Sequence, residues 1–141
     1  MKIYIGSDHA GVELKSQIKK HFGNEYEFVD VGAFSSESVD YPEFAHAVAE
    51  NVLNECDGMG ILICGTGNGM AMTANKHAGI RAALCWAPEI ASLAKQHNNA
   101  NIVVLPARFI PTELAFETLD AFFSSEFEGG RHQRRIDKIN L

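Results

Sequence analysis

The stretch Ile61-Leu62-Ile63-Cys64-Gly65-Thr66-Gly67-Asn68-Gly69-Met70 joins an apolar run to a loop with glycine at every second position. Residues 59–63 are typical of a buried strand, and the sequence from Ala71 onward is typical of a helix. Cys64 is therefore expected where a strand ends and a helix begins. Glycines let the backbone approach a ligand closely, and free N–H groups at a helix start favour a bound anion or a thiolate.

The glycine spacing in this loop is G-x-G-x-G, which differs from two widespread phosphate-binding motifs. Met70 stands where a dinucleotide-binding fingerprint requires its third glycine, and the chain contains no G-x-x-x-x-G-K-[ST] sequence. NAD and ATP are therefore poorly supported, and we expect no cofactor.

The composition indicates one ordinary globular domain spanning residues 1–141. With 46% hydrophobic residues, the chain can bury a core without disulfides or metal ions. The formal net charge of −6 argues against nucleic-acid and membrane partners, because both recruit basic surfaces.

The cysteines favour a cytoplasmic location. Cys56, Cys64 and Cys85 are an odd number without C-x-x-C spacing, and the N-terminus lacks the pattern of a signal peptide. A reducing compartment fits this usage best. In addition, no apolar run approaches the roughly 18 residues that suggest a membrane span.

Strand-like and helix-like segments alternate along the chain. Strands are expected at residues 2–7, 27–31, 59–63, 80–85 and 102–105. Helices are expected at residues 11–22, 41–54, 71–76, 88–96 and 111–123. This alternation predicts an α/β fold, a three-layer α/β/α sandwich around a doubly wound, Rossmann-like sheet of five parallel strands. We expect the strand order 2-1-3-4-5, followed by a polar, basic tail at residues 126–141.

Ligands of such sheets bind beyond the carboxyl ends of the strands, where the winding direction reverses. In the expected order this point lies between the first and third strands, so it is flanked by residues 8–11 and 64–69. Two further segments attract attention. Residues 97–101 place one histidine among three amides, and residues 129–135 hold three arginines, whose forked guanidinium groups suit phosphate.

These segments together resemble a known family, the type B ribose-5-phosphate isomerases and the wider group that includes the galactose-6-phosphate isomerase subunits. The resemblance spans nearly the whole chain and rests on the order and spacing of its motifs. They are Gly6-Ser7-Asp8-His9-Ala10-Gly11, Asp40-Tyr41-Pro42, residues 64–70 with Ala74-Asn75-Lys76, Gly79-Ile80-Arg81-Ala82, His97-Asn98 and Gly129-Gly130-Arg131-His132.

The resemblance implies a metal-free aldose–ketose isomerisation of ribose 5-phosphate and ribulose 5-phosphate through an enediolate. Such chemistry requires ring opening, a base, stabilisation of negative charge on oxygen, and a grip on the phosphate. Two alternatives stay open. One is the same reaction on a six-carbon sugar phosphate, such as galactose 6-phosphate or allose 6-phosphate. The other is a non-catalytic sensor of a phosphorylated sugar, because a fold does not fix a function.

The resemblance also assigns roles to individual residues. Cys64 is the base and His97 is the acid that assists ring opening. One subclass of the family uses a glutamate at the position of Met70, so here the cysteine must act. Contacts to the sugar oxygens are carried over to Asp8 and Asn98. Contacts to the enediolate oxygens are carried over to the backbone of Gly65, Thr66, Gly67, Asn68 and Gly69. Contacts to the phosphate are carried over to His9, Arg108, Arg131 and Arg135.

The family builds its site between two subunits, so the resemblance implies a homodimer, or a homotetramer. Residues 126–141 would then reach into a neighbouring subunit. Other side chains are expected to be structural: Cys56, Cys85, His21, His46 and His77. Asp40-Tyr41-Pro42 is explained as a helix cap and left out of the site. Whether His132 and Arg134 contact substrate stays open.

Overall fold

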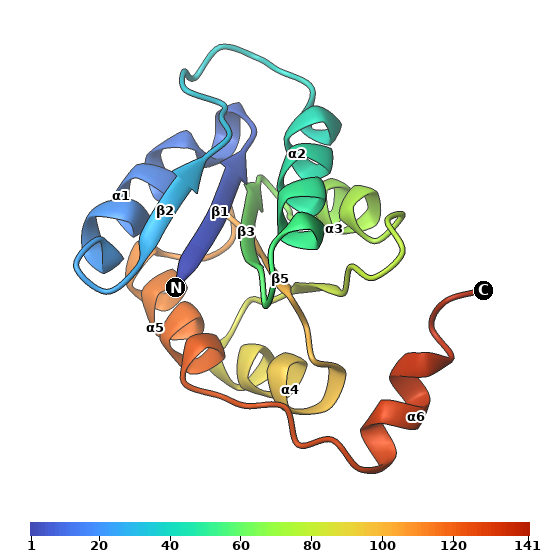
Figure 1. Cartoon of the computed structure of the whole chain (residues 1–141). Helices are drawn as coiled ribbons and strands as arrows, with labels where there is room; N and C mark the ends of the chain where they lie inside the picture. Colours follow the sequence, from blue (N-terminus) through green and yellow to red (C-terminus); the bar gives the residue numbers. More distant parts are fainter.

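The computed structural model describes residues 1–141 and places a five-stranded parallel sheet between two layers of helices (Figure 1). The strands are β1 (Lys2–Ser7), β2 (Glu27–Asp30), β3 (Met59–Cys64), β4 (Ala82–Leu84) and β5 (Ile102–Pro106). The helices are the 3-10 turn η1 (His9–Gly11), α1 (Val12–Phe22), α2 (Tyr41–Asn54), α3 (Asn68–Ala74), α4 (Pro88–Asn98), α5 (Thr112–Phe123) and α6 (Arg131–Asp137). The predicted three-layer sandwich is confirmed. None of the helices combines the length and the apolar character needed to cross a membrane.

The strand order is β2-β1-β3-β5-β4, so the predicted order 2-1-3-4-5 is wrong for its last two strands. β5 pairs with β3 from Gly60↔Ile102 to Cys64↔Pro106, and β4 forms the edge. The burial of the two strands explains the difference. Every residue of β5 is buried, as suits a β-branched run in the centre of a parallel sheet, whereas the three residues of β4 are only partly buried.

In this order, the helix that follows β3 lies on the opposite face of the sheet from the helices that follow its two neighbouring strands. One apolar core packs α1, α4 and α5 against the sheet, and a second packs α2 and α3 against its other face. The strands on both sides of β3, β1 and β5, therefore lead to helices on one face, while β3 itself leads to α3 on the other. Ligand crevices form at such reversals, so the loop after β3 is flanked by two of them.

The C-terminal tail contains a helix that the sequence analysis missed. Gly129 and Gly130 both have positive φ, and α6 begins directly after them. α6 contacts α4 and stands apart from the two helical layers (Figure 1). Its buried residues are His132 and Ile136, one helical turn apart.

Candidate active site

Cys64 is the last residue of β3, and its sulfur is held by the glycine loop. The Gly67 N–H donates to Cys64 Sγ at 3.2 Å. Gly67 has φ +80°, a left-handed conformation suited to glycine, and it is the N-cap of α3. α3 begins at Asn68, three residues before the predicted start. Cys64 is buried, with 5% of its surface exposed, beneath α2 and α3.

The surroundings of Cys85 are opposite in character to those of Cys64. The Cys85 thiol donates to the Ala83 carbonyl at 3.4 Å, and burial raises its pKa to about 12. Such a thiol stays protonated and fits the expected structural role. The sulfur of Cys64 instead accepts a hydrogen bond from the Gly67 N–H. Cys56 is exposed.

The β1 exit places Asp8 and His9 on one side of this loop. The Asp8 N–H donates to the Ile63 carbonyl at 3.1 Å, which ties the β1 exit to the end of β3. The Asp8 carboxylate is buried and accepts from the Ala10 N–H at 2.9 Å. His9 Nδ1 accepts from the Val39 N–H at 3.3 Å, so the neutral ring carries its proton on Nε2.

The β5 exit places Arg108 on the other side. The Arg108 N–H donates to the Gly65 carbonyl at 3.1 Å. A Cβ atom at Gly65 would lie 3.2 Å from Arg108 Cδ and Nη1, so the guanidinium lies directly against this glycine. This proximity requires β5 beside β3, and the predicted strand order would have separated the two exits. Of the other loop residues, Thr66 and Asn68 are exposed, and Thr66 Oγ1 accepts from the Asn68 N–H at 3.2 Å.

Tyr41, which the sequence analysis assigned to a helix cap, is a neighbour of the glycine loop. Asp40 occupies the N-cap position of α2 but makes no side-chain capping hydrogen bond, so that explanation is incomplete. The Tyr41 ring packs on Gly69, where any Cβ atom would collide with it. Tyr41 is itself exposed at the rim of the loop. The recurrence of Asp40-Tyr41-Pro42 among the family motifs was the signal for this contact.

A second group of predicted residues gathers at the end of α4. His97 and Asn98 lie in the last turn of this helix, which ends two residues later than predicted. Together with His132 and Arg135 they line a hollow of about 320 Å³, whose remaining lining residues are Ile136 and Ile139. Arg131, the first residue of α6, is exposed, as are Arg134 and Arg135.

Arg81 holds the end of α4 in place, a role that the sequence analysis did not assign. Its Nε donates to the carbonyls of Asn98 and Asn99 at 3.0 and 2.9 Å. Burial lowers the pKa of Arg81, but an arginine remains charged at neutral pH. A fixed cation at the C-terminal end of a helix also stabilises the helix dipole.

The Cys64 loop and the end of α4 lie at opposite ends of the sheet's strands. Cys64 is paired with Pro106 at the carboxyl end of β5, whereas α4 leads into the other end of β5 at Ile102. Four residues of extended strand separate these ends by roughly 13 Å. In Figure 1 the tips of β1 and β2 point to the top, and α4 and α6 lie at the bottom. A single chain therefore does not bring His97 to Cys64.

The chain matches known proteins over nearly its whole length. A family model described as Ribose/Galactose Isomerase matches residues 3–139. Ribose-5-phosphate isomerase B of Escherichia coli (strain K12) is 46% identical over 140 residues, which cover 98% of this chain and 93% of the relative.

Solved structures agree with this match. A ribose 5-phosphate isomerase from Thermotoga maritima has a TM-score of 0.95 and 55% identity, covering 99% of this chain and 97% of that one. Ribose-5-phosphate isomerase B from Mycoplasma genitalium, with bound ribulose-5-phosphate, has a TM-score of 0.93 and 46% identity, covering 98% and 93%.

The structure thus defines an α/β protein with a cysteine and a glycine-rich loop at the carboxyl end of a central parallel strand. The chain belongs to the ribose/galactose isomerase family.

Proposed function

We propose that this protein interconverts ribose 5-phosphate and ribulose 5-phosphate through an enediolate, without a cofactor. The observation that carries the proposal is the Cys64 sulfur, held by a loop N–H at the end of β3. Relatives of nearly the same length are named for this reaction, and one was solved with ribulose-5-phosphate bound.

In the proposed reaction, His97 opens the sugar ring. Its imidazolium gives a proton to the ring oxygen as the bond to C1 breaks, and the resulting imidazole takes the proton of the C1 hydroxyl group. Asp8 and Asn98 contact the sugar oxygens and hold the open chain. Proton transfers of this kind contribute about 10²–10⁴-fold to a rate.

Cys64 then moves the proton between the two carbon atoms. Its thiolate removes the proton from C2, and the electron pair forms an enediolate with negative charge on O1. The N–H groups of residues 65–69 stabilise this oxyanion, as preorganised donors do in other enzymes. The Cys64 thiol returns the proton to C1, while a proton passes from O2 to O1. Atoms and electrons balance within the substrate, so no oxidant is needed.

The phosphate is held by four cationic or hydrogen-bonding side chains in this proposal. His9 and Arg108 lie beside the Cys64 loop, and Arg131 and Arg135 lie on α6. Because arginine forks bind phosphate oxygens in pairs, they can anchor the far end of the sugar.

The proposed site needs two copies of the chain, because the residues around the Cys64 loop and the residues of α4 and α6 lie at opposite ends of the strands. A homodimer, or a homotetramer built from it, would place the α4 end of one copy over the Cys64 loop of the other. Residues 126–141 would reach across with α6. Large exposed apolar side chains after the strands support burial of this edge by a second copy; they are Phe34, Met72, Trp86 and Phe109.

The remaining properties of the chain fit a metabolic enzyme built as one unit of 141 residues. We propose that it acts in the cytoplasm, because its three cysteines are free. Its net charge of −6 supports neither a nucleic acid nor a membrane as partner.

The family description names both ribose and galactose, so it leaves one alternative, a six-carbon sugar phosphate as the preferred substrate. Values of kcat/KM measured side by side on ribose 5-phosphate, allose 6-phosphate and galactose 6-phosphate distinguish a five-carbon from a six-carbon preference. Tight binding of all three without turnover would instead indicate a sensor.

The test of the proposed function is Cys64→Ala. We expect a loss of about 10³-fold or more in kcat, and loss of deuterium exchange at C2, because the base is removed. Binding of ribose 5-phosphate, measured by calorimetry, should persist. Cys56→Ala is the matched control, since this exposed thiol lies away from the loop. Equal turnover by wild type and Cys64→Ala would remove Cys64 from the mechanism.

A further inference from the structure

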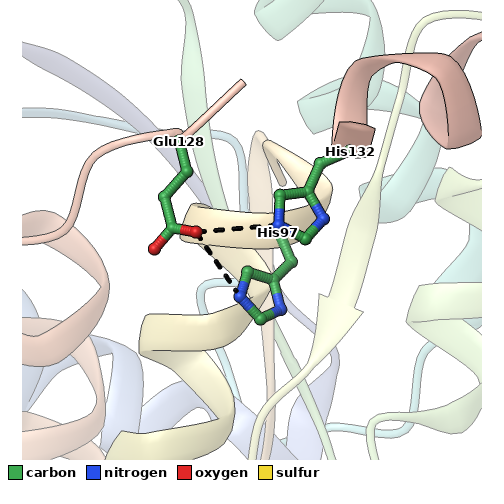
Figure 2. Close-up of side chains that lie close together, drawn as sticks. All are labelled: His97, Glu128 and His132. Carbon is green, nitrogen blue, oxygen red and sulfur yellow. Dashed lines mark ion pairs between the residues drawn. The ribbon is translucent and has the colours of Figure 1, made fainter. Parts of the chain in front are cut away.

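Three side chains at the end of α4 gather around one point (Figure 2). Glu128 Oε1 lies 3.7 Å from His97 Nε2 and 3.6 Å from His132 Nε2. The two imidazole rings are stacked, with centroids 4.3 Å apart and planes 14° from parallel. One ligand atom from each of the three residues lies within 4.8 Å of the others.

The backbone fixes this arrangement from two elements. The Glu128 N–H donates to the Gln96 carbonyl at 3.0 Å, which ties the tail to the turn that carries His97. His132 is buried at the start of α6, and its ring is stacked against that of His97. The cluster therefore exists within one chain and does not depend on a neighbour.

The spacing is too long for hydrogen bonds but suits a shared cation. Neither nitrogen comes close enough to the carboxylate for an N–H···O bond, which needs about 3.2 Å or less. Ligands at ordinary Zn–N and Zn–O distances in a tetrahedron are roughly 3.3–3.5 Å apart. The Glu128 distances of 3.6 and 3.7 Å approach this spacing, and rotation of the two stacked imidazole rings would be needed to turn both nitrogens toward one ion. Two histidines and a glutamate are a known zinc ligand set.

The charges around the cluster are compatible with a metal ion. Burial lowers the pKa of His132, and His97, Arg131 and Arg135 lower it further, against the opposing effect of Glu128. Arg131 and Arg135 repel a cation, so the Glu128 carboxylate is needed to offset them.

We propose that His97, Glu128 and His132 bind one divalent transition-metal ion of the zinc and cobalt class, and that this ion inhibits the enzyme. The inhibition, though not the binding, rests on the proposed function, because a metal-bound His97 cannot exchange protons during ring opening. The isomerisation itself stays metal-free.

The binding is tested by titrating the intact, assembled protein with Co²⁺. We expect one ion per chain, with visible d–d absorption from nitrogen and oxygen ligands and no thiolate charge-transfer band. Glu128→Gln and His132→Asn should each weaken Co²⁺ binding roughly tenfold or more. Replacing even a residue that only hydrogen-bonds to a metal ligand typically lowers metal affinity by about that much.

The matched control is His77→Asn, which breaks the other histidine pair of the chain. His46 Nδ1 and His77 Nε2 lie 2.7 Å apart, and this pair has no carboxylate in its cluster. Co²⁺ affinity should be unchanged in this variant. The proposal is overturned if Co²⁺ does not bind, if Glu128→Gln binds it as tightly as wild type, if thiolate bands appear, or if His77→Asn abolishes binding.

The inhibition is tested separately with Zn²⁺. Turnover of ribose 5-phosphate should fall as Zn²⁺ is added and return with a chelator, and Glu128→Gln should require roughly tenfold more Zn²⁺ or more for the same loss. Full activity of wild type with the site loaded would contradict the inhibitory role. Absence of ribose 5-phosphate turnover in wild type and in every variant, with Co²⁺ binding intact, would refute the proposed function but not the metal site.

Discussion

Gly67 connects the backbone geometry of the loop to the chemistry of Cys64. Its positive φ directs its N–H at the sulfur, and a Cβ atom there would collide with Leu84 Cδ1. We predict that Gly67→Ala lowers the free energy of unfolding by about 3 kcal/mol, from left-handed strain and overpacking together. Turnover should fall as well, because the N–H leaves the sulfur. Urea unfolding and initial rates measure the two effects.

Gly129→Ala is the control for this prediction. Gly129 also has a positive φ, of +69°, but nothing lies within 4 Å of a Cβ atom there. The variant should lose only about 1 kcal/mol from backbone strain. Equal losses at both positions would show that the contact with Leu84 is unimportant.

The sequence predicted single residues well where backbone chemistry is local. The glycine spacing around Cys64 placed the sulfur at a strand end, as observed. Tyr41 and Glu128 were missed because their contacts, to Gly69 and to His97, join segments about 30 residues apart. No local pattern encodes such contacts.

At the scale of elements, the hydrophobic pattern predicted the strands and most helices but not the order of β4 and β5. Both segments are short apolar runs, and order depends on which run gains more from burial on two faces. The β-branched residues of β5 and the alanines of β4 held that information. α6 was missed because a seven-residue helix with only His132 and Ile136 buried has almost no periodic signal.

The contact between α1 and the end of β2 provides an element-scale prediction. Lys15 Nζ and Lys19 Nζ each lie 2.8 Å from an oxygen of Asp30, and the Lys15 and Asp30 side chains are 3% and 12% exposed. Asp30→Asn leaves the Lys15 charge buried without its charged partner, with the Ala33 carbonyl as its remaining acceptor. We predict a loss of about 3 kcal/mol in the free energy of unfolding. Lys19→Met, at a side chain 37% exposed, should cost about 1 kcal/mol or less.

The same contact predicts a pH dependence. Burial alone would raise the pKa of Asp30, but hydrogen bonds from Lys15, Lys19 and the Gly32 N–H outweigh it and lower the pKa below 3.8. The carboxylate therefore stabilises the fold above its ordinary pKa, and this stabilisation is lost as the pH falls through the lower folded value. Unfolding measured from neutral to strongly acidic pH should show a steeper loss for wild type than for Asp30→Asn. Parallel curves would contradict the pairing.

At the scale of the whole molecule, the fold divides the proposed machinery between its two ends. The carboxyl edge of the sheet carries Cys64, Asp8 and Arg108, and the α4 end carries His97 and the α6 arginines. Sequence motifs identified both halves but gave no distance between them. That distance follows from the parallel strands, which put β-to-α loops and α-to-β loops at opposite edges.

The shared site is tested by mixing two inactive variants, Cys64→Ala and His97→Asn. In a symmetric dimer of one copy of each, one site has an intact Cys64 and an intact His97, and the other site lacks both. Random assembly of equal amounts should therefore restore about a quarter of wild-type turnover. If unfolded and refolded mixtures stay as inactive as the separate variants, although mixed dimers have formed, Cys64 and His97 do not act across two chains.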